Sequence, residues 1–516
     1  MDIYGRAKDV NLGVSPVLDE ALSEYRPFGE SVHIQQQFVA FSMRRLRRLG
    51  ADLPSAAALA DALDTAEFDL KYRTLADTVC RCCIDRALRW VMTGAEYELA
   101  FRTCDHVFRA ITQNLAEPWP DSAVLADLAP LDAEHHHTRI WADEWTPTVF
   151  AETLRSLVVS NYGEAPLWTP GADELAMLRR GTRLLGELLP RSSYSALSHT
   201  HLLAVFTSSG PWKSTASSSS FSLGGIIFLR RDLLQNPWWI AEHIFHEALH
   251  QKLYEFRCGY TLLQEDALTE QYDPAANRAG ITVPWNSPGL TNANYWDTHR
   301  AVAAYHVYVQ LSLLCATAED RAAELEDAYG PMAGAGPRMT PAIVALDRAH
   351  YLGEKIRERC WPELGKAGQL LVDWLTSILW ALDPSVPPKG AQMHLLFNRY
   401  LREAASIEGQ RPPPAPSGEL AALTHDEIQR TRAVLSLLEA DEEASQFESA
   451  LGQMTHEGAN AGFPEVRRLI AKTLLDLCPD GYTFRAIPSG PTTPEEMVRQ
   501  MVERSSRKLA EAQALS

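Results

Sequence analysis

The sequence predicts a mainly α, multi-helical fold with a small β element next to one central helix. Three observations support this fold class. Apolar residues recur every three or four positions along much of the chain, as they do on the buried face of a helix. Proline and glycine clusters such as Glu117–Pro120 separate these runs. One short apolar run, Gly224–Leu229, is typical of a buried strand.

Residues 1–190 are expected to form one helix after another, because their apolar side chains recur at helical spacing. These positions include Phe38, Phe41, Met43, Leu46 and Leu49, and further on Cys80, Ile84, Ala87, Leu88 and Val91. Ser208–Pro211 and Ser217–Ser220 are typical of loop, and the predicted strand follows them.

The central helix has clear start and stop signals. Asn236 is a good N-cap, and Pro237 suits the first helical position because its missing N–H has no helical partner there. We expect this helix to run to about Arg257, with Gly259 as the residue that ends it.

A loop rich in Gly, Pro and Asn, residues 280–294, leads into a second long helix, expected from about Tyr295 to Ala318. Its apolar stretch is short for a bilayer span and contains two polar residues, so we interpret it as a buried core helix. A proline-rich segment, residues 411–416, is the best linker candidate. The sequence therefore suggests three regions: an N-terminal helical lobe (1–190), a central lobe (191–405) and a C-terminal helical region (406–516).

Composition narrows the function classes. The formal net charge of −18 disfavours nucleic acid and anionic membranes as main partners. The N-terminal residues Met1–Arg6 lack the pattern of a signal peptide, and eight scattered cysteines do not resemble a disulfide framework. We therefore expect a cytoplasmic protein with free thiols. The sequence does not fix its oligomeric state.

The central helix carries an HExxH motif, His246-Glu247-Ala248-Leu249-His250. Histidines four positions apart lie one above the other on a helix, so His246 and His250 can reach one metal ion. Glu247 lies about 100° further round the helix, where a general base or a supporting group is expected. The alternative is a helix that packs two core histidines without a metal.

A third metal ligand must come from elsewhere. The metzincin pattern is excluded, because Leu253 and Phe256 stand where it needs glycine and histidine. A later glutamate, Glu265 or Glu270, could serve as it does in other zinc enzymes. His299 is the stronger candidate, since it opens the second helix beside a loop. The other histidine of that face, His306, lies two turns deeper and is expected to be a packing residue.

The segment Phe245–Leu253 resembles the signature helix of HExxH-type peptide-modification proteins of ribosomal peptide biosynthesis. In that family a Pro-Trp and then a histidine on an apolar helix follow the motif, and here Pro284–Trp285 and His299–Val302 stand in that order. The resemblance covers roughly residues 200–320. One departure is Asn286–Leu290, which stands where the family usually has an Arg-Pro.

The resemblance implies a non-haem Fe(II), 2-oxoglutarate-dependent oxygenase that hydroxylates an unactivated side-chain carbon of a peptide or amino acid. Such an enzyme needs a cation for the distal carboxylate of 2-oxoglutarate, and a guanidinium binds carboxylates bidentately. Arg230, Arg231 and Arg300 are the nearby candidates; Arg230 and Arg231 end the predicted strand on opposite faces. If a carboxylate completes the ligand set instead, Asp297 or Glu265 would provide it.

Imidazole ligands suit zinc and iron alike, so two further functions stay open. A zinc metallopeptidase would use Glu247 as its general base, whereas the oxygenase requires no proton transfer by this residue. A non-catalytic, helical peptide-binding scaffold would bind no stoichiometric metal.

Other chemical signals have simpler interpretations. Cys80, Cys82 and Cys83, with Cys104 and His106, are expected to be a packing cluster and not a second metal site. His135–His137 is expected in an exposed loop, and Arg44–Arg48 on a solvated helix face.

Overall fold

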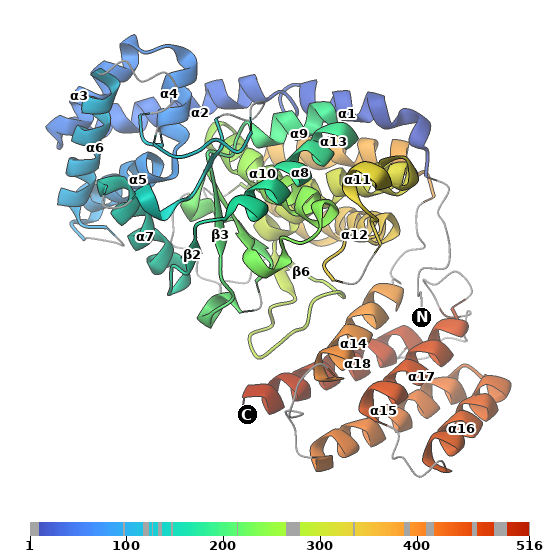
Figure 1. Cartoon of the computed structure of the whole chain (residues 1–516). Coiled ribbons are helices and arrows are strands. Elements are labelled where there is room, and N and C mark those ends of the chain that lie inside the picture. The colour runs from blue at the N-terminus through green and yellow to red at the C-terminus, as the bar shows by residue number, and fades with distance from the viewer. Residues whose placement is uncertain are drawn as a thin grey trace.

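The computed structural model in Figure 1 confirms the predicted fold class. It describes residues 10–95, 99–116, 123–125, 127–132, 137–145, 148–213, 215–264, 279–333, 336–385, 393–408, 417–456, 462–478, 484 and 493–514. Within these residues, eighteen α-helices account for most of the chain and seven short strands form a small β element.

The bounds of the helices follow. The α-helices are α1 (Ser15–Glu24), α2 (Ser31–Leu49), α3 (Pro54–Thr65), α4 (Phe68–Ala76), α5 (Thr78–Thr93), α6 (Phe101–Ala116), α7 (Val149–Tyr162), α8 (Ala172–Leu188), α9 (Pro190–Leu197), α10 (Pro237–Gly259), α11 (Thr298–Tyr329), α12 (Ala342–Lys355), α13 (Lys366–Leu382), α14 (Met393–Glu408), α15 (Ser417–Leu437), α16 (Asp441–His456), α17 (Phe463–Asp476) and α18 (Pro494–Ala514).

The seven strands form two sheets. The strands are β1 (Arg139–Ile140), β2 (Leu167–Trp168), β3 (Leu202–Phe206), β4 (Ser217–Ser218), β5 (Ile226–Arg230), β6 (Gly280–Thr282) and β7 (Tyr295–Asp297). In the larger sheet β1, β3 and β5 are parallel, β2 pairs antiparallel with β3, and β4 pairs antiparallel with β5. The smaller sheet is the antiparallel pair β6–β7.

The predicted strand is confirmed as β5, displaced by two residues at its start. Both β3 and β5 are runs of buried apolar side chains, as is usual for parallel strands covered on both faces. The prediction of loop at Ser217–Ser220 is wrong for its first half, because Ser217 and Ser218 pair with Leu229 and Phe228 as β4. That pairing depends on residues further along the chain and leaves no local signal.

Helix α10 is the central helix, as predicted. The Asn236 side chain accepts a hydrogen bond from the Trp238 N–H at 2.9 Å, and Pro237 occupies the first turn. The helix packs against α2, α8, α9, α11 and β5, so it is covered on nearly every side (Figure 1). Most of its side chains are buried.

Polar side chains fix α10 against its neighbours. Gln251 accepts from the Gly225 N–H at 2.7 Å and donates to the Ile226 carbonyl at 2.8 Å, which joins the helix to β5. Lys252 is buried and donates to the Gly29 carbonyl at 2.6 Å, between α1 and α2. Glu255, also buried, accepts from Tyr72 of α4 at 3.0 Å. These contacts hold the motif helix in a fixed register.

Helix α11 differs from its prediction at both ends. It begins at Thr298, because Tyr295–Asp297 pairs with β6 as strand β7 and Asp297 caps the helix by accepting from the Arg300 N–H at 2.8 Å. It ends at Tyr329, since a partly exposed, charged segment continues the apolar part. This is the one helix within the described residues that is long and apolar enough to span a bilayer. Its most apolar window is 94% buried, as in the core helix of a soluble protein.

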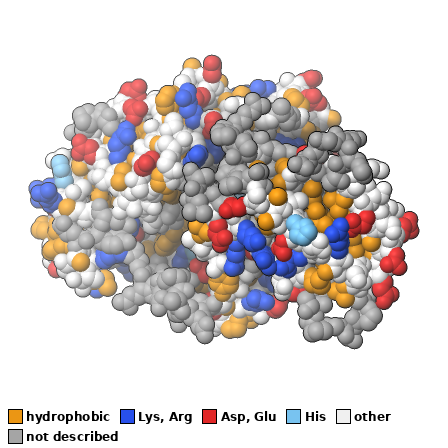
Figure 2. Space-filling view, turned by 90° about the horizontal axis from the view of Figure 1, so that it is seen from below, with side chains coloured by type: hydrophobic (Ala, Val, Ile, Leu, Met, Phe, Trp, Pro, Cys, Tyr) orange, Lys and Arg blue, Asp and Glu red, His pale blue; other side chains and the backbone are white. Residues whose placement is uncertain are grey.

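Helices α14–α18 form a C-terminal bundle with its own apolar core (Figure 1). Buried Arg467 pairs with Glu427 at 2.8 Å inside it. The predicted linker at residues 411–416 lies outside the described residues, and the domain boundaries at 190 and 405 stay predictions. Figure 2 shows the molecule from below, with basic side chains gathered near the middle of this face.

Candidate metal centre

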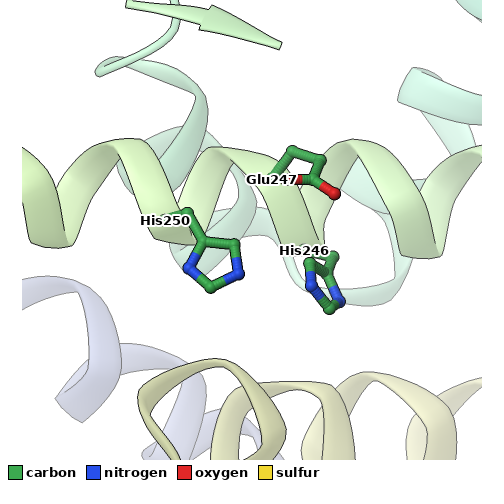
Figure 3. Close-up of side chains that lie close together, drawn as sticks. All are labelled: His246, Glu247 and His250. Atoms are coloured by element: carbon green, nitrogen blue, oxygen red, sulfur yellow. The ribbon is translucent and has the colours of Figure 1, made fainter. Parts of the chain in front are cut away.

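The two histidines of the motif project from the same side of α10 toward the neighbouring helix (Figure 3). His246, Glu247 and His250 can each offer a ligand atom, and these atoms lie within 4.8 Å of one another. The two imidazole centroids are 5.1 Å apart. No other group of three such side chains in the described part of the chain lies as close together. The structure therefore places the predicted pair where one ion could contact both.

The imidazoles near this pair are held neutral. Burial, followed by the charge of His246, lowers the pKa of His250 well below its usual value. Burial also lowers the pKa of His299 and of His306, in both cases to about 3. A metal ion binds the deprotonated imidazole, so neutral rings are ready ligands.

The carboxylate of Glu247 is fixed by two serines that the sequence did not single out. It is buried, and its two oxygens accept hydrogen bonds from Ser217 and Ser219, each at 2.6 Å. Ser217 begins β4 and Ser219 directly follows it, so in extended backbone their side chains can lie on one side. The sheet edge thus holds Glu247 at both oxygens.

His299 does not join the group. Its Nε2 accepts a hydrogen bond from Nη1 of Arg257, so this lone pair is already engaged. The role of His299 as third ligand stays a prediction; ligation through Nε2 would require Arg257 to move away.

His306 does not join the group either, but its ring has an unpartnered nitrogen. It is buried on α11, its Nδ1 has no hydrogen-bond partner, and its Nε2 contacts Gln310 at 2.9 Å. The Nδ1 atom of His250 is likewise buried without a partner. Two orphaned imidazole nitrogens on facing helices fit a metal ion that would bind them.

The predicted carboxylate-binding arginines are placed differently from one another. Arg230 pairs with Asp232 at 2.8 Å, and Arg231 pairs with Glu174 at 2.6 Å. Arg300 stacks over Trp296 at 4.7 Å and has no carboxylate partner among the described residues. Of the three arginines, Arg300 is the one that remains open to an anionic ligand.

Arg257 is a cation that the sequence analysis missed. It lies seven residues after His250 on α10, which places it two turns along the same face. Its guanidinium lies 4.3 Å over the Phe221 ring and forms no ion pair within the described residues. Burial lowers its pKa, the opposite of what a carboxylate partner would do. The spacing of seven was the signal that could have identified it.

The remaining candidates fall into three groups. Glu265 and Glu270 lie outside the described residues, as do His135 and His136. Asp297 caps α11 through its side chain. The cysteines Cys80, Cys82, Cys83 and Cys104 are buried core residues, as the packing interpretation predicts, whereas His106 is exposed.

The fold and site define a mainly helical protein with a central HExxH helix that could bind a metal ion. A search of protein-family models found no match, and curated proteins showed no significant sequence similarity to this chain. The function must therefore be argued from the site.

Proposed function

We propose that this protein is a non-haem Fe(II)/2-oxoglutarate-dependent oxygenase that hydroxylates a side-chain carbon of a peptide or amino acid. The observation that carries this choice is the hydrogen bonding of both carboxylate oxygens of Glu247. A peptidase needs a carboxylate oxygen open toward a metal-bound water. Here each oxygen already accepts a hydrogen bond from a serine at 2.6 Å, which suits a residue that positions the helix.

The metal would be held by His246, His250 and one histidine of α11. His306 is our choice for this third position, because its ring is buried and its Nδ1 lacks a partner. His299 is the alternative. Bound Fe(II) supplies the activation of dioxygen that this reaction needs.

The cosubstrate would bind through its carboxylates. Arg257 and Arg300 carry no carboxylate partner in the described part of the chain, and a guanidinium matches a carboxylate in a two-point contact. In the overall reaction one oxygen atom of O₂ enters the substrate C–H bond as a hydroxyl group. The other enters the succinate formed when 2-oxoglutarate loses CO₂. Arg230, paired with Asp232, is not part of this proposal.

The substrate would be a peptide, such as a ribosomal precursor peptide, or an amino acid. The net charge of −18 makes nucleic acid and anionic membranes poor partners. We place the protein in the cytoplasm, where iron, 2-oxoglutarate and reduced thiols occur together. These assignments follow the resemblance of the motif segment and the composition.

The test is metal content and 2-oxoglutarate binding of the full-length protein purified without air. We expect about one iron per chain and metal-dependent 2-oxoglutarate binding, both lost in His246→Ala. His306→Gln and His299→Gln are a matched pair on one helix. Loss of iron in the first alone supports His306 as ligand, and loss in the second alone supports His299. Absence of 2-oxoglutarate binding in the iron-loaded protein would overturn the proposal.

A zinc metallopeptidase is the second candidate, favoured by the closeness of Glu247 to both histidines. Glu247→Gln separates the two functions. A peptidase would lose all hydrolysis while keeping its metal, whereas the oxygenase would keep measurable turnover. A scaffold would contain no stoichiometric metal.

A further inference from the structure

A cluster of aromatic and basic side chains adjoins the candidate metal centre on the His246 side. The Tyr308 ring of α11 lies 6.5 Å from the His246 ring, and the Trp285 ring lies 5.9 Å from that of Tyr308. Trp296 stands edge-on to Trp285 at 5.7 Å. The guanidinium of Arg348, from α12, is 5.3 Å from the centroids of both Trp285 and Tyr308.

This cluster presents hydrogen-bond donors that lack acceptors. The indole N–H groups of Trp285 and Trp296 are buried without a partner, and so is Nε of Arg348. Nη1 of Arg348 donates a hydrogen bond to the Tyr308 hydroxyl at 3.0 Å. Arg348 forms no ion pair among the described residues. Arg300, stacked on Trp296, forms none there either. A buried donor without an acceptor is unfavourable, so neighbouring orphaned donors indicate a ligand that only accepts.

The cluster is held in place by helices of the C-terminal bundle. Arg402 of α14 donates to the Trp285 carbonyl at 2.8 Å, and Arg399 donates to the carbonyl of Asn286. Glu503 of α18 accepts from Asn294 at 3.2 Å. The loop that carries Trp285 is thus fixed by the C-terminal bundle, which suits a preformed binding surface.

We propose that Arg348, Trp285 and Trp296 form a subsite for a carboxylate of the substrate, an aspartate or glutamate side chain. This inference rests on the proposed function and names its substrate class. The flat guanidinium fork and the indole N–H groups offer the donors that a carboxylate accepts from. The cosubstrate has its own cation in Arg257, two turns beyond His250, so the two anions would lie on opposite sides of the histidine pair.

The test uses full-length, iron-loaded protein without air and with saturating 2-oxoglutarate. The probes are N-acetyl-aspartate amide and its uncharged analogue N-acetyl-asparagine amide, measured by calorimetry. We expect the aspartate compound to bind about tenfold more tightly. Arg348→Met should abolish this preference and leave iron content and 2-oxoglutarate affinity unchanged. The control Arg359→Met alters an exposed arginine that follows the same helix and should change nothing.

A second variant protects the test against a folding defect. Trp285→Phe keeps an aromatic ring but removes the N–H donor, and should weaken aspartate binding about fivefold. Equal binding of the two probes to the wild-type protein, or no binding, would overturn the subsite. Loss of 2-oxoglutarate affinity in Arg348→Met would assign this cation to the cosubstrate and also overturn it. Failure of the proposed function would instead show as absent 2-oxoglutarate binding in the wild-type protein.

Discussion

The C-terminal bundle should stabilise the loop that carries Trp285, and Arg402→Met tests this directly. The arginine is exposed, and its guanidinium donates to the Trp285 carbonyl at 2.8 Å. A charged donor to a neutral acceptor contributes about 1–2 kcal/mol when one partner is exposed. The substitution keeps most of the apolar stem and removes the donor. Local opening of the loop should therefore become about five- to thirtyfold more frequent.

Hydrogen–deuterium exchange of peptides covering residues 283–297 measures this opening. Three amides in this stretch report it, because they donate to carbonyls of the same loop: Val283 to Asn294, Ala293 to Pro288 and Tyr295 to Asn292, each at 2.8 Å. The matched control is Arg432→Met, which breaks an exposed ion pair within the bundle and does not touch the loop. Unchanged exchange in Arg402→Met, or equal acceleration in both variants, would refute the reasoning.

Three further changes have defined outcomes. Ser219→Ala removes one of the two donors to Glu247 and should raise the Kd for the metal about tenfold to a hundredfold in a chelator competition; an unchanged Kd would contradict the positioning role. Asp77 caps α5, and burial raises its pKa from 3.8 to about 7. Because the unfolded carboxyl ionises first, wild-type stability should fall as pH rises from about 4 to 7, by at most about 4 kcal/mol. Urea unfolding of Asp77→Asn should lack this slope, and a slope that persists would exclude Asp77 as its cause. Arg230→Met should lower stability by less than about 1 kcal/mol and leave 2-oxoglutarate affinity unchanged, since the arginine pairs with Asp232; a lost affinity would return it to the site.

The central helix could be predicted because its signals are local. Asn236 and Pro237 mark its start, Gly259 its end, and the spacing of His246 and His250 sets them on one face. The same spacing, carried two turns further, reaches Arg257. Where the residues of a site lie on one helix, the periodicity of the sequence is sufficient to predict which of them share a face.

The second long helix shows the limit of such signals. The sequence predicts helix at Tyr295–Asp297, but this segment pairs with Gly280–Thr282 as a strand. Neither segment alone carries a signal for this pairing. The predicted end of this helix, at Ala318, is too early, because an apolar run marks only the buried part of a helix. Residues beyond Ala318 in α11 are mostly exposed and charged, yet the helix continues to Tyr329.

The supporting residues of the site depend on contacts between distant elements. Ser217 and Ser219 reach Glu247 only because β4 pairs with β5 beside α10. The choice between His299 and His306 depends on how α10 and α11 pack, which periodicity within α11 cannot supply. Sequence reasoning therefore found the residues that share one helix and missed those that tertiary packing brings to it.

Three arginines near the motif lack carboxylate partners within the described residues, in a chain that is acidic overall. The chain carries 66 acidic against 48 basic side chains, so carboxylates outnumber cationic side chains. Arg257, Arg300 and Arg348 nevertheless form no ion pair within the described residues, although all three lie against aromatic rings near the motif. Arg257 and Arg348 are partly buried, and a buried guanidinium without a counter-charge destabilises a fold, so their place near the histidine pair supports the proposed function. In the proposed function, anionic ligands bound at the site would supply the missing counter-charges.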